Sequence, residues 1–421
     1  MGRDAKLVVL GQGYVGLPLA VRAAEVGYRV VGVDPDEGRV RRLRAGQSYV
    51  EDVAAARLEE AARAGRYAVS TDPDDAAGFD VAVITVPTPL RDGAPDLSFV
   101  ETATRALAAH VRPGCLVVLE STTYPGTTEE LVRPLLEAGS GLRAGRDFSL
   151  GYSPERIDPG NTAWGLVDTP KVVAGVDPTS LAAVQAFFSS VVARTVPVSS
   201  CRAAELTKLL ENTFRHVNIA LVNEIAMLAH GLDIDVWEVL DAAATKPFGF
   251  MRFTPGPGVG GHCLPIDPSY LSWRVKRTTG RDFRFVELAN EINAHMPDYV
   301  VQRAALALNR RRLAVNGSRV LLLGLAYKRD VGDVRESPAV RVAELLHGLG
   351  AEVRAVDPHV DRAWSHPDLL RAELDAAEVA AADLVLVLVA HRALDVALLE
   401  PARAKVLDVC RDDRLEGVER L

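Results

Sequence analysis

The sequence has few cysteines and no long apolar run, and these two lacks exclude several classes of protein. Its four cysteines are far apart and show no Cys-x-x-Cys spacing, so we expect neither a disulfide framework nor a zinc or other metal site. The apolar stretches, for example residues 384–390, are too short to span a bilayer. The N-terminal residues show no signal-peptide pattern. We therefore expect a protein of the reducing cytoplasm without a membrane partner.

The sequence also lacks an excess of positive charge. It has 56 Asp and Glu against 48 Lys and Arg, which gives a formal net charge of −8. Proteins that bind nucleic acid usually carry a basic field, so nucleic acid is not an expected partner. Local Lys and Arg side chains can still bind a phosphorylated ligand on an acidic protein.

Two α/β patterns are present in the chain, which at 421 residues is too long for one ordinary core. Short apolar runs alternate with helical patterns, which is typical of doubly wound parallel sheets. The first pattern has runs at residues 6–10, 28–33, 81–86, 116–120, 148–152 and 171–174. The second has runs at residues 319–326, 352–358, 383–390 and 405–409.

A predicted helical region separates these two patterns. Residues 201–231 contain no Gly or Pro before Gly231, and apolar side chains recur there at helical spacing. A helix of that length, roughly 45 Å, normally links domains or forms a dimer core. Further helices are expected at 236–244 and between 268 and 311. We therefore expect two Rossmann-like doubly wound domains, 1–200 and 313–421, joined by a long central helix and a helical dimerisation region, 201–312.

A glycine-rich turn follows the first predicted strand. It reads Gly11-Gln12-Gly13-Tyr14-Val15-Gly16, and Asp34 ends the next strand, 18 residues after Gly16. In such a turn the glycines permit a tight bend, close approach to a pyrophosphate and close packing of helix on strand. A carboxylate at the position of Asp34 can bond the ribose hydroxyls and repel a 2′-phosphate, which favours NAD over NADP. The alternative is a structural turn that binds nothing.

A loop rich in Gly and Pro carries Cys263. It runs from Pro255 to Asp267 and reads PGPGVGGHCLPID. Its glycines carry no Cβ, so backbone can approach a ligand closely. Cys263, four residues before Asp267, is interpreted as a nucleophile beside a carboxylate. The alternative is a buried structural thiol after a glycine turn.

Polar segments follow three predicted strands, where folds of this kind bind ligands. Thr88 and Thr122 could contact the cofactor. Glu155, followed by Arg156, could act as a general base or orient a water molecule. Each segment could instead be an ordinary loop or cap.

Two pairs of basic and polar residues complete the candidates. Lys208 and Asn212 share a helix face and could donate hydrogen bonds to a developing oxyanion, or they could belong to a solvated face on which Glu205 and Glu211 neutralise Lys208. Lys328 and Arg335 follow the first strand of the second pattern and suit a phosphorylated ligand. Asp330 and Asp333 could instead balance them as surface charge.

Together these residues resemble the nucleotide-sugar 6-dehydrogenases of the UDP-glucose/GDP-mannose dehydrogenase family, over about residues 5–410. The most specific marker is Gly258-x-Gly260-Gly261-x-Cys263-x-x-x-Asp267. The resemblance implies an N-terminal NAD domain, a homodimer formed through the central region, and a C-terminal domain for the nucleotide sugar. It further implies oxidation of a sugar C6 alcohol to a carboxylate, with two NAD used in succession.

The resemblance also implies residue roles. Cys263 is the nucleophile that forms a thiohemiacetal and then a thioester. The oxyanion-stabilising pair is Lys208 and Asn212, the acids are Glu155 and Asp267, and Thr122 lies near the nicotinamide. The substrate-binding set is Glu155, Arg156, Lys208, Asn212, Arg215, His216, Phe253, Gly260, Lys328 and Arg335.

The sequence around Cys263 most resembles the UDP-N-acetylhexosamine 6-dehydrogenase subgroup. Arg215 and His216 are then candidates for recognising the substituent at sugar C2. A UDP-glucose or TDP-glucose 6-dehydrogenase with the same mechanism is the alternative. A two-electron hydroxy-acid dehydrogenase would need neither Cys263 nor the second α/β domain, and a non-catalytic sensor would need no intact set of catalytic residues.

Overall fold

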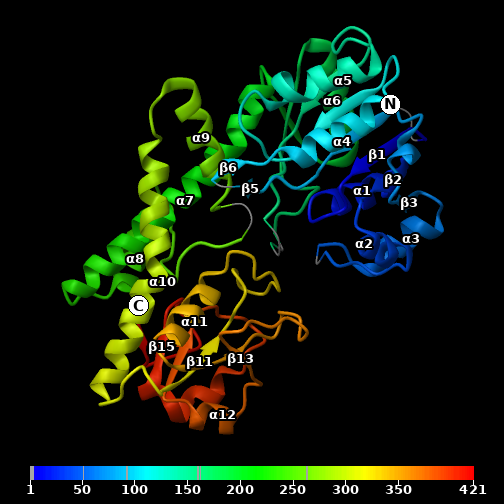
Figure 1. The fold of residues 1–421 in the computed structure, drawn as a ribbon. Coiled ribbons are helices and arrows are strands. Elements are labelled where there is room, and N and C mark those ends of the chain that lie inside the picture. The colour runs from blue at the N-terminus through cyan, green and yellow to red at the C-terminus, as the bar shows by residue number, and fades with distance from the viewer. Residues whose placement is uncertain (1–3, 51, 92, 159–160, 162, 262–263) are drawn as a thin grey trace. The chain divides into compact units, whose positions relative to one another are not determined.

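The computed structural model describes residues 4–50, 52–91, 93–158, 161, 163–261 and 264–421, which form two compact units (Figure 1). The first unit comprises Met1–Glu211 and Ser269–Arg281, and the second comprises Asn212–Pro268 and Asp282–Leu421. Helices α7 (Cys201–Gly231) and α9 (Asp267–Thr279) have residues in both units. The three-domain division with limits at 200 and 312 stays a prediction.

An eight-stranded sheet lies inside the first unit, in the order β10-β9-β8-β7-β4-β1-β2-β3. Neighbouring strands are parallel except β8 and β9, which are antiparallel. All residues of β4 and β7 are buried, as continuous apolar runs in a covered sheet require. The strands are β1 (Lys6–Leu10), β2 (Arg29–Val33), β3 (Tyr67–Ser70), β4 (Val81–Ile84), β7 (Leu116–Leu119), β8 (Ser149–Tyr152), β9 (Lys171–Gly175) and β10 (Thr195–Pro197).

Helices cover this sheet and bury its apolar side chains. Leu7 and Val9 of β1 share one core with Leu17 of α1 and with Phe187 and Phe188 of α6. The helices are α1 (Gly16–Glu25), α2 (Glu37–Arg44), α3 (Ala55–Arg63), α4 (Ser98–Ala108), α5 (Arg133–Ser140) and α6 (Pro178–Val191), with short turns η1 (Pro73–Ala76) and η2 (Thr128–Val132) and a hairpin of β5 (Leu90–Arg91) and β6 (Ala94–Pro95).

The second unit contains a six-stranded parallel sheet in the order β13-β12-β11-β14-β15-β16. Its core joins Val320 and Leu322 of β11 to Val300 and Ala304 of the long helix α10. The strands are β11 (Arg319–Leu323), β12 (Glu352–Val356), β13 (Leu370–Arg371), β14 (Leu384–Val387), β15 (Val406–Asp408) and β16 (Glu419–Arg420). The helices are α8 (Val236–Ala244), α10 (Arg284–Arg310), α11 (Pro338–Gly348), α12 (Ala376–Ala381) and η3 (Val396–Lys405).

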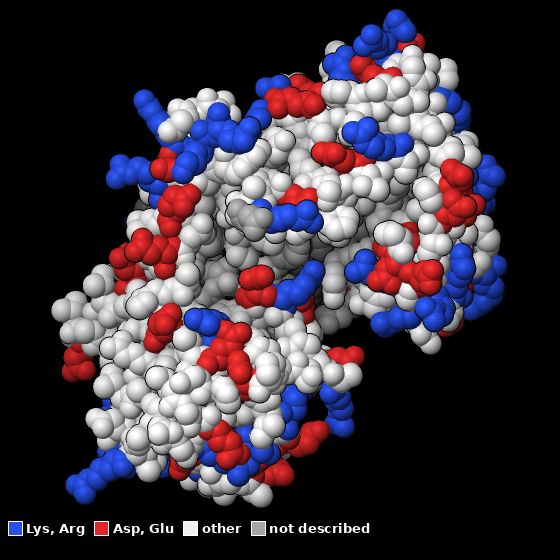
Figure 2. Space-filling model, viewed as in Figure 1, with Lys and Arg blue, Asp and Glu red and all other residues white. Residues whose placement is uncertain are grey.

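The predicted fold class is confirmed: the chain is an α/β protein with two large sheets, and the long helices α7 and α10 come between the strands of these sheets in the sequence. The 31-residue helix α7 is where the sequence predicts it. None of the described helices combines the length and apolar character that a bilayer-spanning helix needs. Acidic and basic side chains are interspersed over the face shown in Figure 2.

Candidate active site

The glycine turn of the first unit has the shape that a dinucleotide site needs. Gly11 has a φ of +92°, and a Cβ there would lie 2.7 Å from the carbonyl oxygen of Thr85. A Cβ on Gly16 would lie 1.9 Å from the carbonyl oxygen of Gly11, so helix α1 packs directly against the turn. Gly13 has no atom within 4 Å of its Cβ position. The first and third glycines are therefore required by packing, whereas the second leaves space for a pyrophosphate.

Hydrogen bonds of Asp34 and Gln12 hold this turn in place. The buried Asp34 carboxylate accepts hydrogen bonds from the backbone N–H groups of Gln12 (2.8 Å) and Asp36 (3.0 Å). The Gln12 side chain accepts a hydrogen bond from the Tyr67 hydroxyl at 2.9 Å. Sequence reasoning missed Gln12 and Tyr67, because their contact joins residues 55 positions apart. The open space at Gly13 and the carboxylate at the end of β2 fit an NAD molecule held by this turn.

The other candidate residues of the first unit follow neighbouring strands of its sheet. Thr88 and Thr122 come after β4 and β7, and Glu155 comes after β8. Because these strands are parallel to β1, the segments lie along the sheet edge that carries the glycine turn, and the segment after β4 is the nearest to it. Thr88 is buried, and its carbonyl oxygen accepts a hydrogen bond from the Tyr270 hydroxyl at 2.5 Å. Thr122 is half-buried.

Glu155 is held by backbone groups and by a buried lysine. Its Oε1 accepts hydrogen bonds from the N–H groups of Arg156 and Ile157, both at 2.6 Å. Its Oε2 accepts a hydrogen bond from Nζ of Lys171, the first residue of β9, at 2.8 Å. The predicted substrate contact Arg156 has a guanidinium that pairs with Glu211 at 2.7 Å. Glu155 is thus in a fixed position, whereas Arg156 must exchange a partner to meet a ligand.

Lys208 does not lie on a solvated face. It is 8% exposed, and no described residue forms a hydrogen bond or ion pair with its ammonium group. Glu205 instead accepts hydrogen bonds from the N–H groups of Gly126 and Thr128, and burial raises the pKa of Glu205 to about 7. Glu211 pairs with Arg156. The alternative in which these two glutamates neutralise Lys208 is therefore wrong.

In the second unit the structure brings together two predicted catalytic residues. The Asn212 side-chain amide donates a hydrogen bond to Oδ2 of Asp267 at 2.5 Å. Both side chains are about 95% buried, with exposures of 5% and 4%. Cys263, the predicted nucleophile four residues before Asp267, lies outside the described residues.

The glycines before Cys263 pack against the segment that follows β11. A Cβ on Gly260 would lie 2.5 Å from the carbonyl oxygen of Glu336, and a Cβ on Gly261 would lie 2.8–3.0 Å from three ring carbons of Tyr327. The N–H of Gly261 also donates to the carbonyl oxygen of Arg335 at 3.0 Å. The loop that leads to Cys263 is therefore attached to the predicted nucleotide-binding segment, a contact that sequence reasoning missed.

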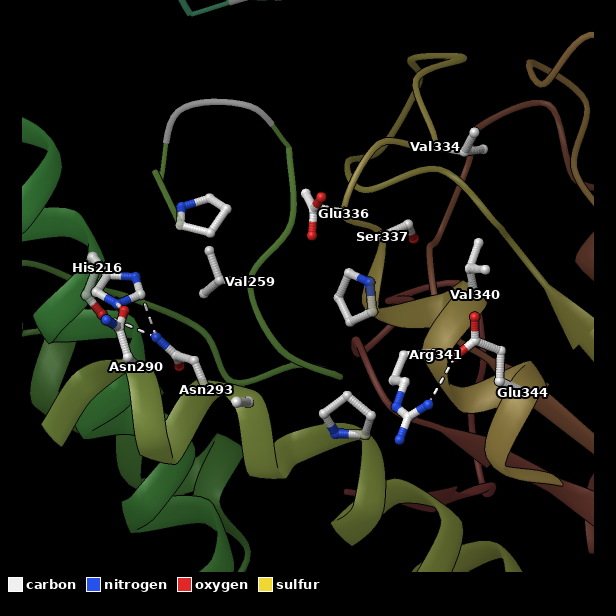
Figure 3. Close-up of a pocket in the computed structure, with 14 residues that line it drawn as sticks. His216, Val259, Asn290, Asn293, Val334, Glu336, Ser337, Val340, Arg341 and Glu344 are labelled. Atoms are coloured by element: carbon white, nitrogen blue, oxygen red, sulfur yellow. Dashed lines mark hydrogen bonds and ion pairs between the residues drawn. The ribbon is translucent and has the colours of Figure 1, made fainter. Parts of the chain in front are cut away.

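His216 belongs to a buried network that borders a cavity of about 640 Å³ (Figure 3). His216 Nε2 bonds Oδ1 of Asn290 at 2.8 Å, and Asn293 in turn accepts from Asn223 at 2.9 Å. Burial lowers the pKa of His216, so its ring is neutral at neutral pH. Val259 of the glycine loop and Glu336, Ser337 and Arg341 line other parts of the cavity, as Figure 3 shows.

Two other predicted substrate contacts of this unit lie elsewhere. Phe253 is half-buried, packs on the cluster around Trp237, and meets Phe214 edge-on at 5.7 Å between ring centroids. Arg215 is exposed. Their roles in binding stay predictions, since their present contacts are structural or with solvent.

The charge of Arg335 is paired with a neighbouring carboxylate. Arg335 forms a two-pronged pair with Asp333, with contacts of 2.6–3.0 Å, on an exposed side chain. This pairing agrees with the surface-charge alternative for Arg335. Lys328, seven residues earlier, is half-buried.

Asp357 ends β12 as Asp34 ends β2, but five donors fill its carboxylate: four backbone N–H groups and Nε2 of His391.

The fold and the glycine turn define the class as an NAD-dependent oxidoreductase with a second α/β unit. Comparison with known proteins agrees. Models of the UDP-glucose/GDP-mannose dehydrogenase family match residues 5–220 (NAD binding domain), 202–295 (central domain) and 321–411 (UDP binding domain). The chain belongs to this family. It is an NAD-dependent nucleotide-sugar 6-dehydrogenase.

Individual relatives resemble the chain over most of its length. It is 39% identical over 356 residues to a UDP-N-acetyl-D-mannosamine dehydrogenase of Pyrococcus horikoshii, covering 84% of each chain. It is 39% identical over 362 residues to a UDP-N-acetyl-D-glucosamine 6-dehydrogenase of Pseudomonas aeruginosa, covering 85% of this chain and 84% of that protein. A solved UDP-D-ManNAc dehydrogenase from Pyrococcus horikoshii superposes with a TM-score of 0.88 at 33% identity, covering 99% and 98% of the two chains.

Proposed function

We propose that this chain oxidises the C6 hydroxyl of a UDP-N-acetylhexosamine to a carboxylate, with Cys263 as the covalent nucleophile. The observation that carries the proposal is the hydrogen bond between the buried side chains of Asn212 and Asp267. An amide and a carboxylate are costly to bury unless they are hydrogen-bonded. This bond meets that condition and holds both groups in place, and Asp267 lies only four residues after Cys263. Two relatives with 39% identity, named for UDP-linked N-acetylhexosamines, support the substrate class.

The chain's own residues divide the work of a four-electron oxidation. The glycine turn and Asp34 would hold NAD, which would supply the hydride acceptor that each of the two oxidation steps needs. Cys263 as a thiolate adds to the C6 aldehyde and holds it as a thiohemiacetal, and after the second oxidation as a thioester. Lys208 and Asn212 donate hydrogen bonds to the oxygen on C6 as negative charge develops there. Asp267, or Glu155, orients and deprotonates the water that releases the carboxylate and restores the thiol.

The His216 network supports recognition of an acetamido group at sugar C2. A neutral imidazole and side-chain amides offer both donors and acceptors, which an amide ligand requires. Lys328 and Arg335 supply positive charge for the diphosphate. The two relatives differ in the configuration of the sugar that they are named for, so the proposal names the class of UDP-N-acetylhexosamines.

A substrate screen combined with Cys263 variants tests the proposal. UDP-GlcNAc, UDP-GalNAc, UDP-ManNAc, UDP-glucose and TDP-glucose are incubated with NAD, and NADH and products are measured. We expect about two NADH for each sugar oxidised, acid formation lost in Cys263→Ala, and a stalled covalent ester in Cys263→Ser. Cys410→Ser, at a half-buried free thiol of the same unit, is the matched control. One NADH for each sugar, or full turnover by Cys263→Ala, would defeat the covalent mechanism, and a preference for a glucose nucleotide would move the substrate to the alternative class.

The proposal includes a homodimer and a cytoplasmic location. Large apolar side chains recur on one stretch of the second unit and are exposed, namely Leu221, Ile225, Leu228 and Leu232. The first three lie on one face of α7, and Leu232 directly follows the end of that helix at Gly231. An exposed apolar surface of this kind is suited to a second copy of the chain. Light scattering of Leu228→Glu against the unmodified protein tests this, since a monomer in both would contradict it. The location rests on the free thiols and on the requirement for a reduced Cys263.

A further inference from the structure

A buried cluster of three charged side chains lies behind Glu155 in the first unit. Lys171 at the start of β9 forms ion pairs with Glu155 and with Glu120, the residue that follows β7. Lys171 and Glu120 are 2% and 1% exposed, and Glu155 is 8% exposed. The free energy needed to bury three charged groups exceeds the stabilisation that a surface ion pair gives. A contribution to stability therefore does not explain this arrangement.

The surroundings of Glu120 favour its neutral form. Its Oε2 is buried and has no hydrogen-bond partner among the described residues, so an ionised Glu120 would be compensated only at Oε1, by Lys171. Burial raises the pKa of Glu120 to about 8; the charge of Lys171 opposes this shift and the charge of Glu155 adds to it. Burial opposes the ionisation of Glu155 too, but the charge and hydrogen bond of Lys171, with hydrogen bonds from Glu120 and from the N–H of Ile157, lower its pKa to about 2.

Few other charged groups face this cluster. The described neighbours that act electrostatically on Glu120 are Lys171 from β9 and Glu155 from the segment after β8. Helix α6 contributes the ring of Phe188, 5.3 Å from Nζ of Lys171. The guanidinium of Arg156 turns to Glu211 of α7 and to the carbonyl oxygen of Pro170. These surroundings favour, at neutral pH, a state with one proton on Glu120, one cation and one anion, and no net charge.

We propose that Glu120 and Lys171 are positioning residues for Glu155, and that ionisation of Glu120 sets an alkaline limit to turnover. Lys171 keeps Glu155 ionised and aimed while Glu120 is neutral. When Glu120 loses its proton, two carboxylates compete for the ammonium group of Lys171, and the interaction between Lys171 and Glu155 weakens. This inference rests on the proposed role of Glu155 in the reaction. It assigns functions to Glu120 and Lys171, which take no direct part in that reaction.

The pH profile of kcat tests the inference, because a merely structural role would not move it. Glu120→Gln mimics the neutral acid, so we expect kcat near that of the unmodified enzyme at neutral pH. Above pH 8 the unmodified enzyme should lose activity by roughly threefold or more, while Glu120→Gln should retain it. Lys171→Met should lower kcat by about 100-fold, and Lys171→Arg should restore part of it. Superimposable profiles for Glu120→Gln and the unmodified enzyme would overturn the proposal.

Two controls keep the result interpretable. Glu205→Gln removes another buried carboxyl with a raised pKa, and it should leave the limb near pH 8 in place. Glu155→Gln tests the role of Glu155 in the reaction separately from the role of Glu120. If Glu155→Gln has full activity, Glu155 takes no part in the reaction. If Glu155→Gln is impaired but Glu120→Gln has the pH profile of the unmodified enzyme, only the positioning proposal is overturned.

A spectroscopic measurement covers the case in which Glu120→Gln does not fold. The infrared carbonyl stretch of a protonated carboxyl is recorded for Glu205→Gln, in which Glu205 no longer contributes. We expect a band at neutral pH that disappears as pH rises through about 8. Absence of that band at neutral pH would contradict the neutral state of Glu120 and overturn the proposal.

Discussion

Replacing Gly261 by alanine tests the attachment of the cysteine loop to the second α/β unit. Gly261 has a φ of +82°, where an L-residue costs roughly 1–2 kcal/mol. The new Cβ would lie 2.8–3.0 Å from three ring carbons of Tyr327, and such overpacking costs roughly 1–3 kcal/mol. We expect a total penalty of about 2–5 kcal/mol, because the ring and the backbone cannot both keep their positions.

This penalty should be visible in two measurements. If the loop keeps its position, the free energy of unfolding falls by that amount. If the loop moves away from Tyr327, stability is retained and kcat/KM for the nucleotide sugar falls by about 30-fold to 5000-fold instead. NAD affinity, measured by NAD titration, should be unchanged, because the glycine turn belongs to the other unit.

Gly256→Ala is the matched control in the same loop. Its Cβ would have no atom within 4 Å, and its N–H bond to Oδ1 of Asn223 at 3.0 Å survives the change. We expect an effect within about 0.5 kcal/mol on unfolding and little change in turnover. If Gly261→Ala and Gly256→Ala behave alike in both measurements, the contact with Tyr327 does not hold the loop.

Two further predictions concern charges of the second unit. Asp357→Asn should lower the free energy of unfolding by about 2–4 kcal/mol at neutral pH, because five donors lose an ionised acceptor. Burial opposes ionisation, but His391 and backbone N–H groups hold the pKa of Asp357 well below its usual 3.8. This stabilisation is therefore full above pH 3.8 and is lost in stronger acid, so a deficit in urea unfolding that does not shrink on acidification would refute the assignment. Arg335→Ala should raise KM for the nucleotide sugar by roughly 10-fold to 100-fold, while Arg362→Ala, an exposed ion-paired arginine, should not; equal KM values would remove Arg335 from the site.

The elements with continuous apolar runs or long helical patterns could be predicted from the sequence. The strand β1 and the helices α7 and α8 have the predicted bounds. The run predicted at 81–86 ends as a strand at Ile84, and the Thr85 hydroxyl beyond it donates to the carbonyl oxygens of Leu10 and Gly11. The short strands β10, β13 and β16 carry too few residues to show a period. The antiparallel direction of β9 depends on its long connection and has no local signal.

The candidate site shows the same division between local and distant information. The glycine turn was recognisable because its residues are contiguous and their order carries the geometry. Lys171 could be predicted only as the start of a strand, since its partners Glu120 and Glu155 come from two other strands. Tyr327 was hidden for the same reason: its side chain packs against two glycines more than 60 positions earlier in the chain.

The carboxylates that end the second strands of the two sheets explain why only one sheet has a dinucleotide turn. Asp34 receives hydrogen bonds from two backbone N–H groups, with Arg39 at 3.5 Å. A carboxylate offers about four acceptor sites, so Asp34 can still bond a ribose. Asp357 already receives five hydrogen bonds from its own chain, so no acceptor site is left for a ribose. A ligand of the second sheet must therefore be bound by other groups, and positive charge from Lys328 and Arg335 suits a diphosphate better than a second NAD.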